Sequence, residues 1–272
     1  MKKNIIFKKI KFPQKINKIK INNFFNKLGL SKLIEKSKKS APLKVNQIVE
    51  PVLPEYPPML VDLYRLYKFI TLNKRTTILE FGSGWSTLII SMALNENKKK
   101  YHKDVLNLRR NNPFELFVLE NKRKFLNDTK FKVNKFCKNS KSKINWHFSE
   151  VYMDQINHRY CTQYKSIPLC NPDLIYLDGP NLFTTKNKIN NFTIDNKDLM
   201  PMVGDIIKIE YFLTPGTIII TDGRSANAQF LKDNFKRKWI YLYDKNFDQH
   251  IFYLNADCLG KWNKRQLKFY SK

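Results

Sequence analysis

The amino-acid sequence predicts an α/β protein built on a mostly parallel sheet whose last strand is antiparallel. Two observations predict this fold class. Between residues 59 and 255, short apolar runs typical of buried strands alternate with segments of helical periodicity. Near the end of this region, strand-like runs at 239–243 and 249–254 flank a five-residue turn, as in a β-hairpin.

The first predicted helix and strand lead into the most informative stretch of the chain. Helical periodicity covers 59–72, and a strand at 76–81 runs into Gly82-Ser83-Gly84 and a helix-like segment, 88–94. Two glycines in a strand-to-helix turn allow a sharp bend and leave room for a ligand against the backbone. The helix start adds free N–H groups there. The basic, polar residues 95–112 are expected to loop out.

The remaining elements follow the same alternation. We expect strands at 115–120, 144–150, 172–180 and 217–223, helices at 122–133, 198–213 and 226–235, and a polar, asparagine-rich loop at 181–196. Ligands of such sheets bind beyond the carboxyl ends of the strands. The carboxylates that end four of the strands should therefore converge on one crevice; these are Glu80, Glu120, Asp178 and Asp222.

Both ends of the chain are predicted to lie outside this domain, which we place at 59–258. Residues 1–45 contain 14 lysines and one acidic residue, and they are expected to form a basic arm, partly helical or disordered. An alternative is a basic amphipathic helix that contacts an anionic membrane through apolar residues at helical spacing (Phe24, Phe25, Leu28, Leu33, Ile34). A proline-rich linker is expected at 46–58 and a basic tail at 259–272.

The composition limits the classes of function. The formal net charge of +27 favours nucleic acid or anionic lipid as a partner, although the excess is mostly lysine and accompanies abundant asparagine and isoleucine, as biased nucleotide composition would produce. No apolar run approaches a membrane span, and the lysines at the start argue against a signal peptide, so the expected location is cytoplasmic. The four cysteines show no pattern of a zinc or disulfide site.

The stretch Glu80-Phe81-Gly82-Ser83-Gly84 resembles the first motif of class I S-adenosylmethionine-dependent methyltransferases. Two later strand ends, at Asp178-Gly179-Pro180 and Asp222-Gly223, are similar to those of the small-molecule O-methyltransferase branch. The resemblance implies a Rossmann-like, seven-stranded sheet with helices on both faces. It also implies that S-adenosylmethionine is the cofactor.

The resemblance also implies roles for individual residues. Glu80, Gly82 and Gly84 would line the methionine part of the cofactor, where Glu80 would bind the ammonium group or order a water beside it. The neighbours Ser83, Trp85 and Ser86 would also contact the cofactor. Glu120 would accept hydrogen bonds from the ribose hydroxyls, Ser149 or Glu150 would flank the adenine, and Asp178 would face the methyl-transfer crevice.

The sequence departs from the family pattern at three places. Ser86 stands where many members have a third glycine, and Glu120 follows Glu80 by 40 residues, about twice the usual spacing of a ribose acid. The Asn/Asp-Pro-Pro-Tyr/Phe signature of enzymes that methylate the amine of adenine is also missing, because Asp178-Gly179-Pro180 occupies that position.

Three residues are candidates for catalysis. Asp178, Asp222 and His250 could assist the removal of a proton from an acceptor hydroxyl, whereas a helix cap for Asp222 and a structural role for His250 are the alternatives. Arg224 could bind an anionic group or form a surface ion pair. A divalent cation between Asp178 and Asp222 is conceivable, but Gly223 replaces the amide ligand that would follow, so we expect no metal.

The sequence thus favours a methyltransferase that acts on a small-molecule or glycan hydroxyl. A nucleic-acid methyltransferase is the first alternative, favoured by the charge. A nicotinamide-dependent oxidoreductase is disfavoured because Thr87 stands where Gly-x-Gly-x-x-Gly needs its last glycine. A non-catalytic scaffold that binds through its basic arm is the remaining alternative.

Overall fold

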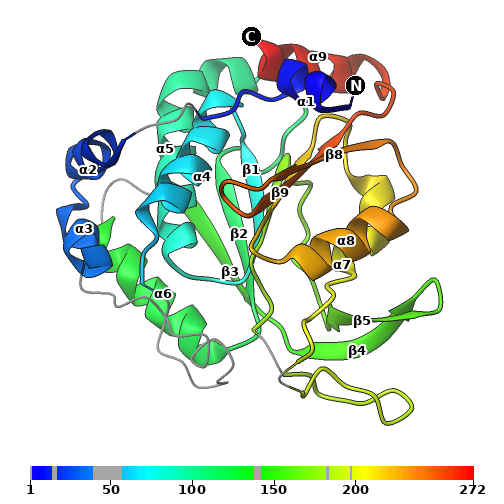
Figure 1. Ribbon diagram of the computed structural model, residues 1–272. Helices are drawn as coiled ribbons and strands as arrows, with labels where there is room; N and C mark the ends of the chain where they lie inside the picture. The colour runs from blue at the N-terminus through cyan, green and yellow to red at the C-terminus, as the bar shows by residue number, and fades with distance from the viewer. Residues whose placement is uncertain (1, 14–16, 39–56, 138–141, 182–183, 197) are drawn as a thin grey trace.

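The computed structural model describes residues 2–13, 17–38, 57–137, 142–181, 184–196 and 198–272. Its centre is a seven-stranded sheet of order β3-β2-β1-β6-β7-β9-β8 (Figure 1). The strands are β1 (Thr77–Phe81), β2 (Glu115–Glu120), β3 (Lys143–Phe148), β6 (Leu174–Leu177), β7 (Ile218–Asp222), β8 (Trp239–Asp244) and β9 (Gln249–Leu254). Strand β9 is antiparallel to both of its neighbours, and the other pairings are parallel. The predicted Rossmann-like fold with an antiparallel hairpin strand is confirmed.

Helices cover both faces of the sheet because alternate strand residues point to opposite sides. Ile78 and Leu116 pack under α4 (Leu60–Leu72), α5 (Trp85–Val105) and α6 (Arg123–Phe136). Leu79 and Phe117 point to the other face, which is covered by α7 (Asp205–Lys208), the 3₁₀ helix η2 (Glu210–Phe212) and α8 (Ser225–Asn234). The two faces form two separate apolar clusters.

Helix α5 is longer than the sequence predicted. It continues through residues 95–105, which were expected to loop out. The reason is that one side of this segment is buried and polar: the Asn97 amide donates hydrogen bonds to the carbonyls of Ile70 and Arg75. On the solvent side, Glu96 and Lys100 form an i,i+4 ion pair. The 21 residues of α5 account for the long spacing between Glu80 and Glu120.

Residues 151–164 form an element that the sequence did not predict. Strands β4 (Val151–Ile156) and β5 (Arg159–Tyr164) pair as a separate antiparallel hairpin that projects from the main sheet (Figure 1). The predicted helix at 198–213 is wrong over its first half, since only α7 and η2 are helical there. Pro201 and Gly204 disfavour a helix in this segment, and Gly204 N–H donates to the carbonyl of Thr162 in β5.

The described part of the basic arm forms three helices, α1 (Lys2–Lys9), α2 (Lys18–Lys27) and α3 (Ser31–Lys38). Phe25, Leu33 and Ile34 are buried in the same apolar cluster as α4 and α5. These three side chains belong to the core, so they are not available for the membrane contact that was the alternative prediction for the arm. Helix α1 packs against the edge strand β8. The predicted linker, 46–58, lies outside the described residues except for Pro57 and Pro58.

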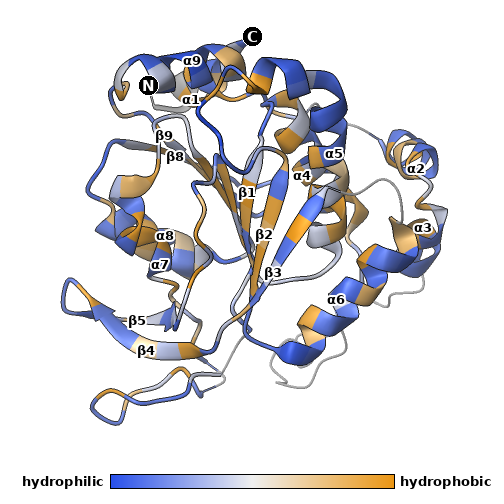
Figure 2. Ribbon diagram, turned by 180° about the vertical axis from the view of Figure 1, so that it is seen from behind, coloured by the Kyte–Doolittle hydropathy of each residue, from blue (hydrophilic) through white to orange (hydrophobic). Residues whose placement is uncertain are grey.

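The expected C-terminal tail is also structured. Residues 260–271 form α9 (Gly260–Ser271), whose Phe269 and Tyr270 are buried against Val105 and Phe114. The helix lies at the amino edge of the sheet, beside α1 (Figures 1 and 2). No helix in the described ranges is long and apolar enough to cross a membrane.

Candidate active site

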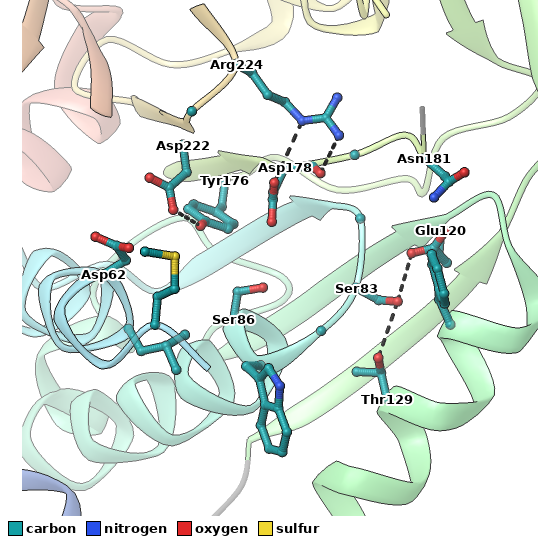
Figure 3. A pocket seen from close by; sticks show the side chains of 18 of the residues that line it. Asp62, Ser83, Ser86, Glu120, Thr129, Tyr176, Asp178, Asn181, Asp222 and Arg224 are labelled. Atoms are coloured by element: carbon teal, nitrogen blue, oxygen red, sulfur yellow. Dashed lines mark hydrogen bonds and ion pairs between the residues drawn. The ribbon is translucent and has the colours of Figure 1, made fainter. Parts of the chain in front are cut away.

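A pocket of about 740 Å³ opens at the carboxyl edge of the sheet (Figure 3). It lies where strands β1, β2, β6 and β7 end, and the start of α4, one side of α6 and the β8–β9 turn complete its walls. Its volume is within the range of small-molecule and cofactor sites. The lining contains six acidic and two basic residues: Asp62, Glu120, Asp128, Asp178, Asp222 and Asp248, with Lys132 and Arg224. A chain of net charge +27 thus encloses a predominantly acidic pocket.

The glycine turn forms one wall of this pocket. Gly82 has a φ of +98°, which favours glycine, and its backbone lies against that of Gly179 at the end of β6. At Gly84 an added Cβ would meet no atom within 4 Å, although this residue lines the pocket. Helix α5 begins immediately afterwards at Trp85. The turn therefore leaves open space next to its backbone and next to a helix start.

Glu80 lies behind the turn rather than in the lining. It is fully buried, and one carboxylate oxygen accepts a hydrogen bond of 2.5 Å from Ser86 Oγ. Its Oε2 atom is buried and has no hydrogen-bond partner. Burial raises the pKa of Glu80 to about 8, even though the hydroxyls of Ser86 and Thr87 lower it. The resemblance placed Glu80 beside the methionine part of the cofactor, to bind its ammonium group or to order a water, and in the structure the carboxylate is buried behind the pocket lining.

Glu120 lies at the pocket surface, where the sequence expected it. Ser83 Oγ donates to its Oε2 atom at 2.8 Å, and the Lys122 amide donates to its Oε1 atom at 2.8 Å. Burial raises the pKa of Glu120, and these hydrogen bonds oppose the shift. Because each carboxylate oxygen can accept more than one hydrogen bond, Glu120 retains acceptor capacity toward the pocket.

The opposite end of the pocket holds three aspartates, Asp62, Asp178 and Asp222 (Figure 3). Tyr176 OH donates to Asp222 Oδ2 at 2.9 Å. Burial raises the pKa of Asp222, and it raises the pKa of Asp62 to about 7 with a further contribution from Asp222. These carboxylates therefore disfavour one another's ionised forms.

Asp178 is the most accessible carboxylate of this group, with 53% of its side chain exposed. The exposed surface opens into the pocket, and the protein around the pocket still desolvates the carboxylate. This desolvation raises the pKa of Asp178 to about 7; Asp222 adds to the increase and Arg224 opposes it. Near neutral pH the group can therefore exist in both protonation states.

Arg224 is held by the strand ends. Its Nη2 atom donates to the carbonyl oxygens of Asp178 and Pro180 at 2.7 and 2.8 Å, and its Nε atom lies 3.7 Å from the Asp178 carboxylate. The guanidinium thus fixes the backbone after β6 and the direction of Asp178. Of the two roles that the sequence offered, the structure shows the ion pair, formed with Asp178, and Arg224 Nη1 is buried without a hydrogen-bond partner.

Trp85, at the start of α5, lines the pocket. Lys132 of α6 and Lys36 of α3 lie 4.7 and 5.4 Å from the centre of its ring. Burial lowers the pKa of Lys132 to about 8, and Lys36 lowers it further. The N-terminal helices therefore contribute to the surroundings of the site, which the sequence did not predict.

Besides Glu80, three predicted site residues lie outside the pocket lining. His250 Nε2 is 2.8 Å from Ser225 Oγ and its Nδ1 is 2.8 Å from Tyr241 OH. This buried histidine therefore contacts Ser225, the first residue of α8. Ser149 Oγ accepts from the Ser166 amide at 3.0 Å. Glu150 pairs with Lys186 at 3.1 Å beside the β4–β5 hairpin. His250, the catalytic candidate, and Ser149 and Glu150, the candidates for flanking the adenine, are therefore not part of the pocket lining.

The sequence missed several pocket residues, above all Asp62 in the first turn of α4 and Phe247 in the β8–β9 turn. Arg65 lies 3.5 Å from the centre of the Phe247 ring and forms an ion pair with Asp244 at 2.8 Å. An aspartate in the first turn of a helix is ordinary on electrostatic grounds, so it gave no signal of a site. Among the described residues, no three His, Cys, Asp or Glu side chains are arranged to hold a metal ion.

The fold can be compared with solved structures. The chain is similar to a methyltransferase of Podospora anserina with S-adenosylhomocysteine bound, at 13% identity over 91% of this chain and 100% of that chain, with a TM-score of 0.44. It is also similar to an O-methyltransferase of Streptomyces achromogenes involved in tomaymycin synthesis, in complex with S-adenosylmethionine, at 12% identity over 84% and 96% of the two chains, with a TM-score of 0.38.

A third similar structure is an O-methyltransferase of Bacillus cereus in complex with S-adenosylhomocysteine, at 13% identity over 82% of this chain and 96% of that chain, with a TM-score of 0.37. No protein-family model matches the sequence, and no curated protein matches it either. The likeness is one of fold.

Proposed function

We propose that this chain is an S-adenosylmethionine-dependent methyltransferase that acts on a hydroxyl group of a small molecule or glycan. The observation that carries the proposal is the glycine turn. Gly82 and Gly179 are needed by the protein itself, because their backbones touch. Gly84 has no such contact and faces open space in the pocket. That space is where a ligand would approach the backbone.

The residues around the turn fit this cofactor. Glu120 offers carboxylate oxygens with remaining acceptor capacity to a pair of ribose hydroxyls. The unpartnered Oε2 atom of Glu80 is buried just behind the turn, where a bridging water would complete its hydrogen bonding. The predominantly acidic lining favours a ligand of net positive charge. When bound, S-adenosylmethionine supplies an electrophilic methyl group on a sulfonium sulfur.

Asp178 is the residue best placed to accept the hydroxyl proton. Its carboxylate opens into the pocket, Arg224 holds its direction, and its pKa of about 7 suits proton transfer near neutral pH. Burial keeps that pKa high with a further contribution from Asp222, whose carboxylate is fixed by Tyr176. Apolar lining residues surround the carboxylates and would exclude water from the acceptor; these include Met59, Leu63, Met200 and Phe247.

Calorimetric titration with S-adenosylmethionine and S-adenosylhomocysteine tests the proposal, with NAD as the comparison ligand. We expect saturable micromolar binding of the two methionine-derived ligands and none of NAD. Gly84→Arg should abolish this binding without unfolding the protein, because the new side chain projects into the pocket. Leu169→Arg, at a 98% exposed loop residue, is the matched control and should bind normally. Absence of binding in nucleic-acid-free protein would favour the scaffold alternative.

A nucleic-acid acceptor remains the second candidate because the net charge is +27. The six carboxylates of the lining disfavour a phosphate backbone inside the pocket, so such an acceptor would have to bind outside and insert a single group. Methyl transfer to total RNA that falls steeply between about 50 and 200 mM salt would support this candidate. Transfer to neutral hydroxyl compounds with little salt dependence would exclude it.

A further inference from the structure

The two ends of the chain build one surface on the side of the molecule opposite the pocket. Helices α1 and α9 lie side by side at the amino edge of the sheet, as both views show (Figures 1 and 2). Lys11 and Lys272 are close enough to Lys74 for both to lower its pKa, after the larger effect of burial. We call this surface the terminal face. It consists of the exposed residues Phe7, Lys8, Lys9, Lys11, Leu259, Lys261, Trp262, Lys264, Arg265, Lys268 and Lys272.

Helix α9 packs one side against the sheet edge and presents its other side outward. Residues three or four apart are buried against the sheet edge: Asn263, Gln266, Phe269 and Tyr270. Asn263 donates to the carbonyl of Pro215, and Tyr270 donates to Asp173. These contacts fix the helix on the domain, so its outward side is a rigid surface and not a loose tail.

The outward side combines cations with large apolar groups. The terminal face has eight lysine or arginine residues and no acidic residue, and Asp104 and Asp257 lie at its border. Phe7 is 55% exposed, Leu259 57% and Trp262 42%. Lys261 and Arg265 lie 5.5 and 4.9 Å from the centre of the Trp262 ring. Aromatic and aliphatic side chains among lysines and arginines are typical of helices that lie in a membrane interface.

We propose that the terminal face docks on the surface of an anionic lipid bilayer. Its cations complement the charge of anionic headgroups, and Trp262, Phe7 and Leu259 would enter the boundary between headgroups and acyl chains. A nucleic acid explains the cations but not the exposed Leu259 and Phe7, because a phosphate backbone offers no apolar partner to them. Docking in this way would leave the pocket open at the opposite edge of the sheet, accessible to a water-soluble acceptor.

Vesicle co-sedimentation of the full chain tests the proposal. The probes are phosphatidylcholine vesicles with and without a quarter of phosphatidylglycerol, at about 0.1 M salt. We expect binding only to the anionic vesicles. Lys261→Ser/Lys264→Ser/Arg265→Ser should weaken it about tenfold or more. The matched control, Lys124→Ser/Arg123→Ser/Lys135→Ser on the exposed side of α6, should change it less than about twofold. Circular dichroism checks that each variant is folded.

Tryptophan fluorescence supplies a second readout that a structural defect would not reproduce. The emission should shift to shorter wavelength with anionic vesicles, and Trp262→Ser should remove the shift while the other three tryptophans remain. Equal binding to neutral and anionic vesicles, or equal losses in the α9 and α6 variants, would overturn the proposal. The proposal would also be overturned if the wild-type protein did not bind vesicles but bound poly(U), and if the α9 variant lost the poly(U) binding. The terminal face would then be a nucleic-acid site.

Discussion

Gly82 and Gly179 touch through their backbones where β1 and β6 end: a Cβ atom on Gly82 would lie 3.0 Å from the amide nitrogen of Gly179. A Cβ on Gly179 would overlap the backbone of Phe81 and Gly82. We therefore expect Gly179→Ala to lower the free energy of unfolding by about 2 to 3 kcal/mol, measured by urea denaturation. Gly84→Ala, in the same turn but next to open space, should cost less than about 1 kcal/mol.

The contrast between these glycines separates a structural from a ligand-binding role. If Gly84→Ala proves as destabilising as Gly179→Ala, the open space beside Gly84 is needed by the fold and the argument for a ligand there fails. If only Gly179→Ala destabilises, loss of cofactor binding in a Gly84 variant reports on the pocket.

The aspartates at the other end of the pocket predict a pH dependence of methyl transfer. Asp178 must be ionised to accept a proton, and its pKa is raised to about 7. The ratio kcat/KM should therefore rise with pH through about 7 and level off above it. Asp178→Asn should lower kcat by roughly 10²- to 10⁴-fold and remove this rise. Asp154→Asn, at a surface pair with Lys208, is the control and should leave the profile unchanged.

A second variant tests why the pKa of Asp178 is raised. Because the charge of Asp222 raises the pKa of both Asp178 and Asp62, Asp222→Asn should shift the midpoint of the profile to lower pH. A midpoint that stays near 7 would mean that another group controls the profile.

Glu80 predicts a pH dependence of stability. Its pKa is about 8 in the folded protein and 4.5 in its ordinary state, so the folded protein favours the protonated form. The contribution of Glu80 to stability is therefore greatest below about pH 4.5 and is lost as the pH rises toward 8. Glu80→Gln does not titrate. Relative to wild type, it should gain stability between pH 5 and pH 8.5, by an amount on the order of a few kcal/mol.

Urea denaturation of both proteins at pH 5, 7 and 8.5 measures this difference directly. Gln retains an oxygen that can accept the hydrogen bond from Ser86, so the contact is conserved. A difference that does not change with pH would show that Glu80 titrates with its ordinary pKa and that water reaches its carboxylate.

The sequence predicted the parts of the fold that depend on local patterns. Buried parallel strands are continuous apolar runs, so β2 and β9 were placed at their observed bounds. Since parallel strands end at one edge, the carboxylates of Glu120, Asp178 and Asp222 were expected together, and all three line the pocket. Periodicity and topology were sufficient for these residues.

Elsewhere the deciding contacts are distant in sequence. The β4–β5 turn has Asn157 and His158 at φ of 50° and 60°, but without a glycine it gave no hairpin signal. His250 was placed on the right strand, yet its ring turns toward Ser225 and Tyr241 instead of the pocket. Asp62 reaches the carboxyl edge of the sheet only because α4 packs across the sheet. Helical periodicity predicts that α4 is a helix but not where its first turn lies.

The C-terminal helix gives the last prediction, because one tyrosine ties it to the sheet. Tyr270 OH donates to Asp173 Oδ2 at 2.9 Å and accepts from Arg110 at 2.6 Å. Asp173 also accepts from the amides of Thr76 and Thr77, so this buried carboxylate joins α9 to the start of β1.

Tyr270→Phe leaves Arg110 and Asp173 each without one hydrogen-bond partner. It should lower the free energy of unfolding by about 1 to 3 kcal/mol, measured by urea denaturation. Tyr211→Phe, at a 71% exposed position, should cost less than about 0.5 kcal/mol. Equal costs for the two variants would mean that α9 detaches readily, and a basic tail would then describe residues 259–272 better than a fixed helix.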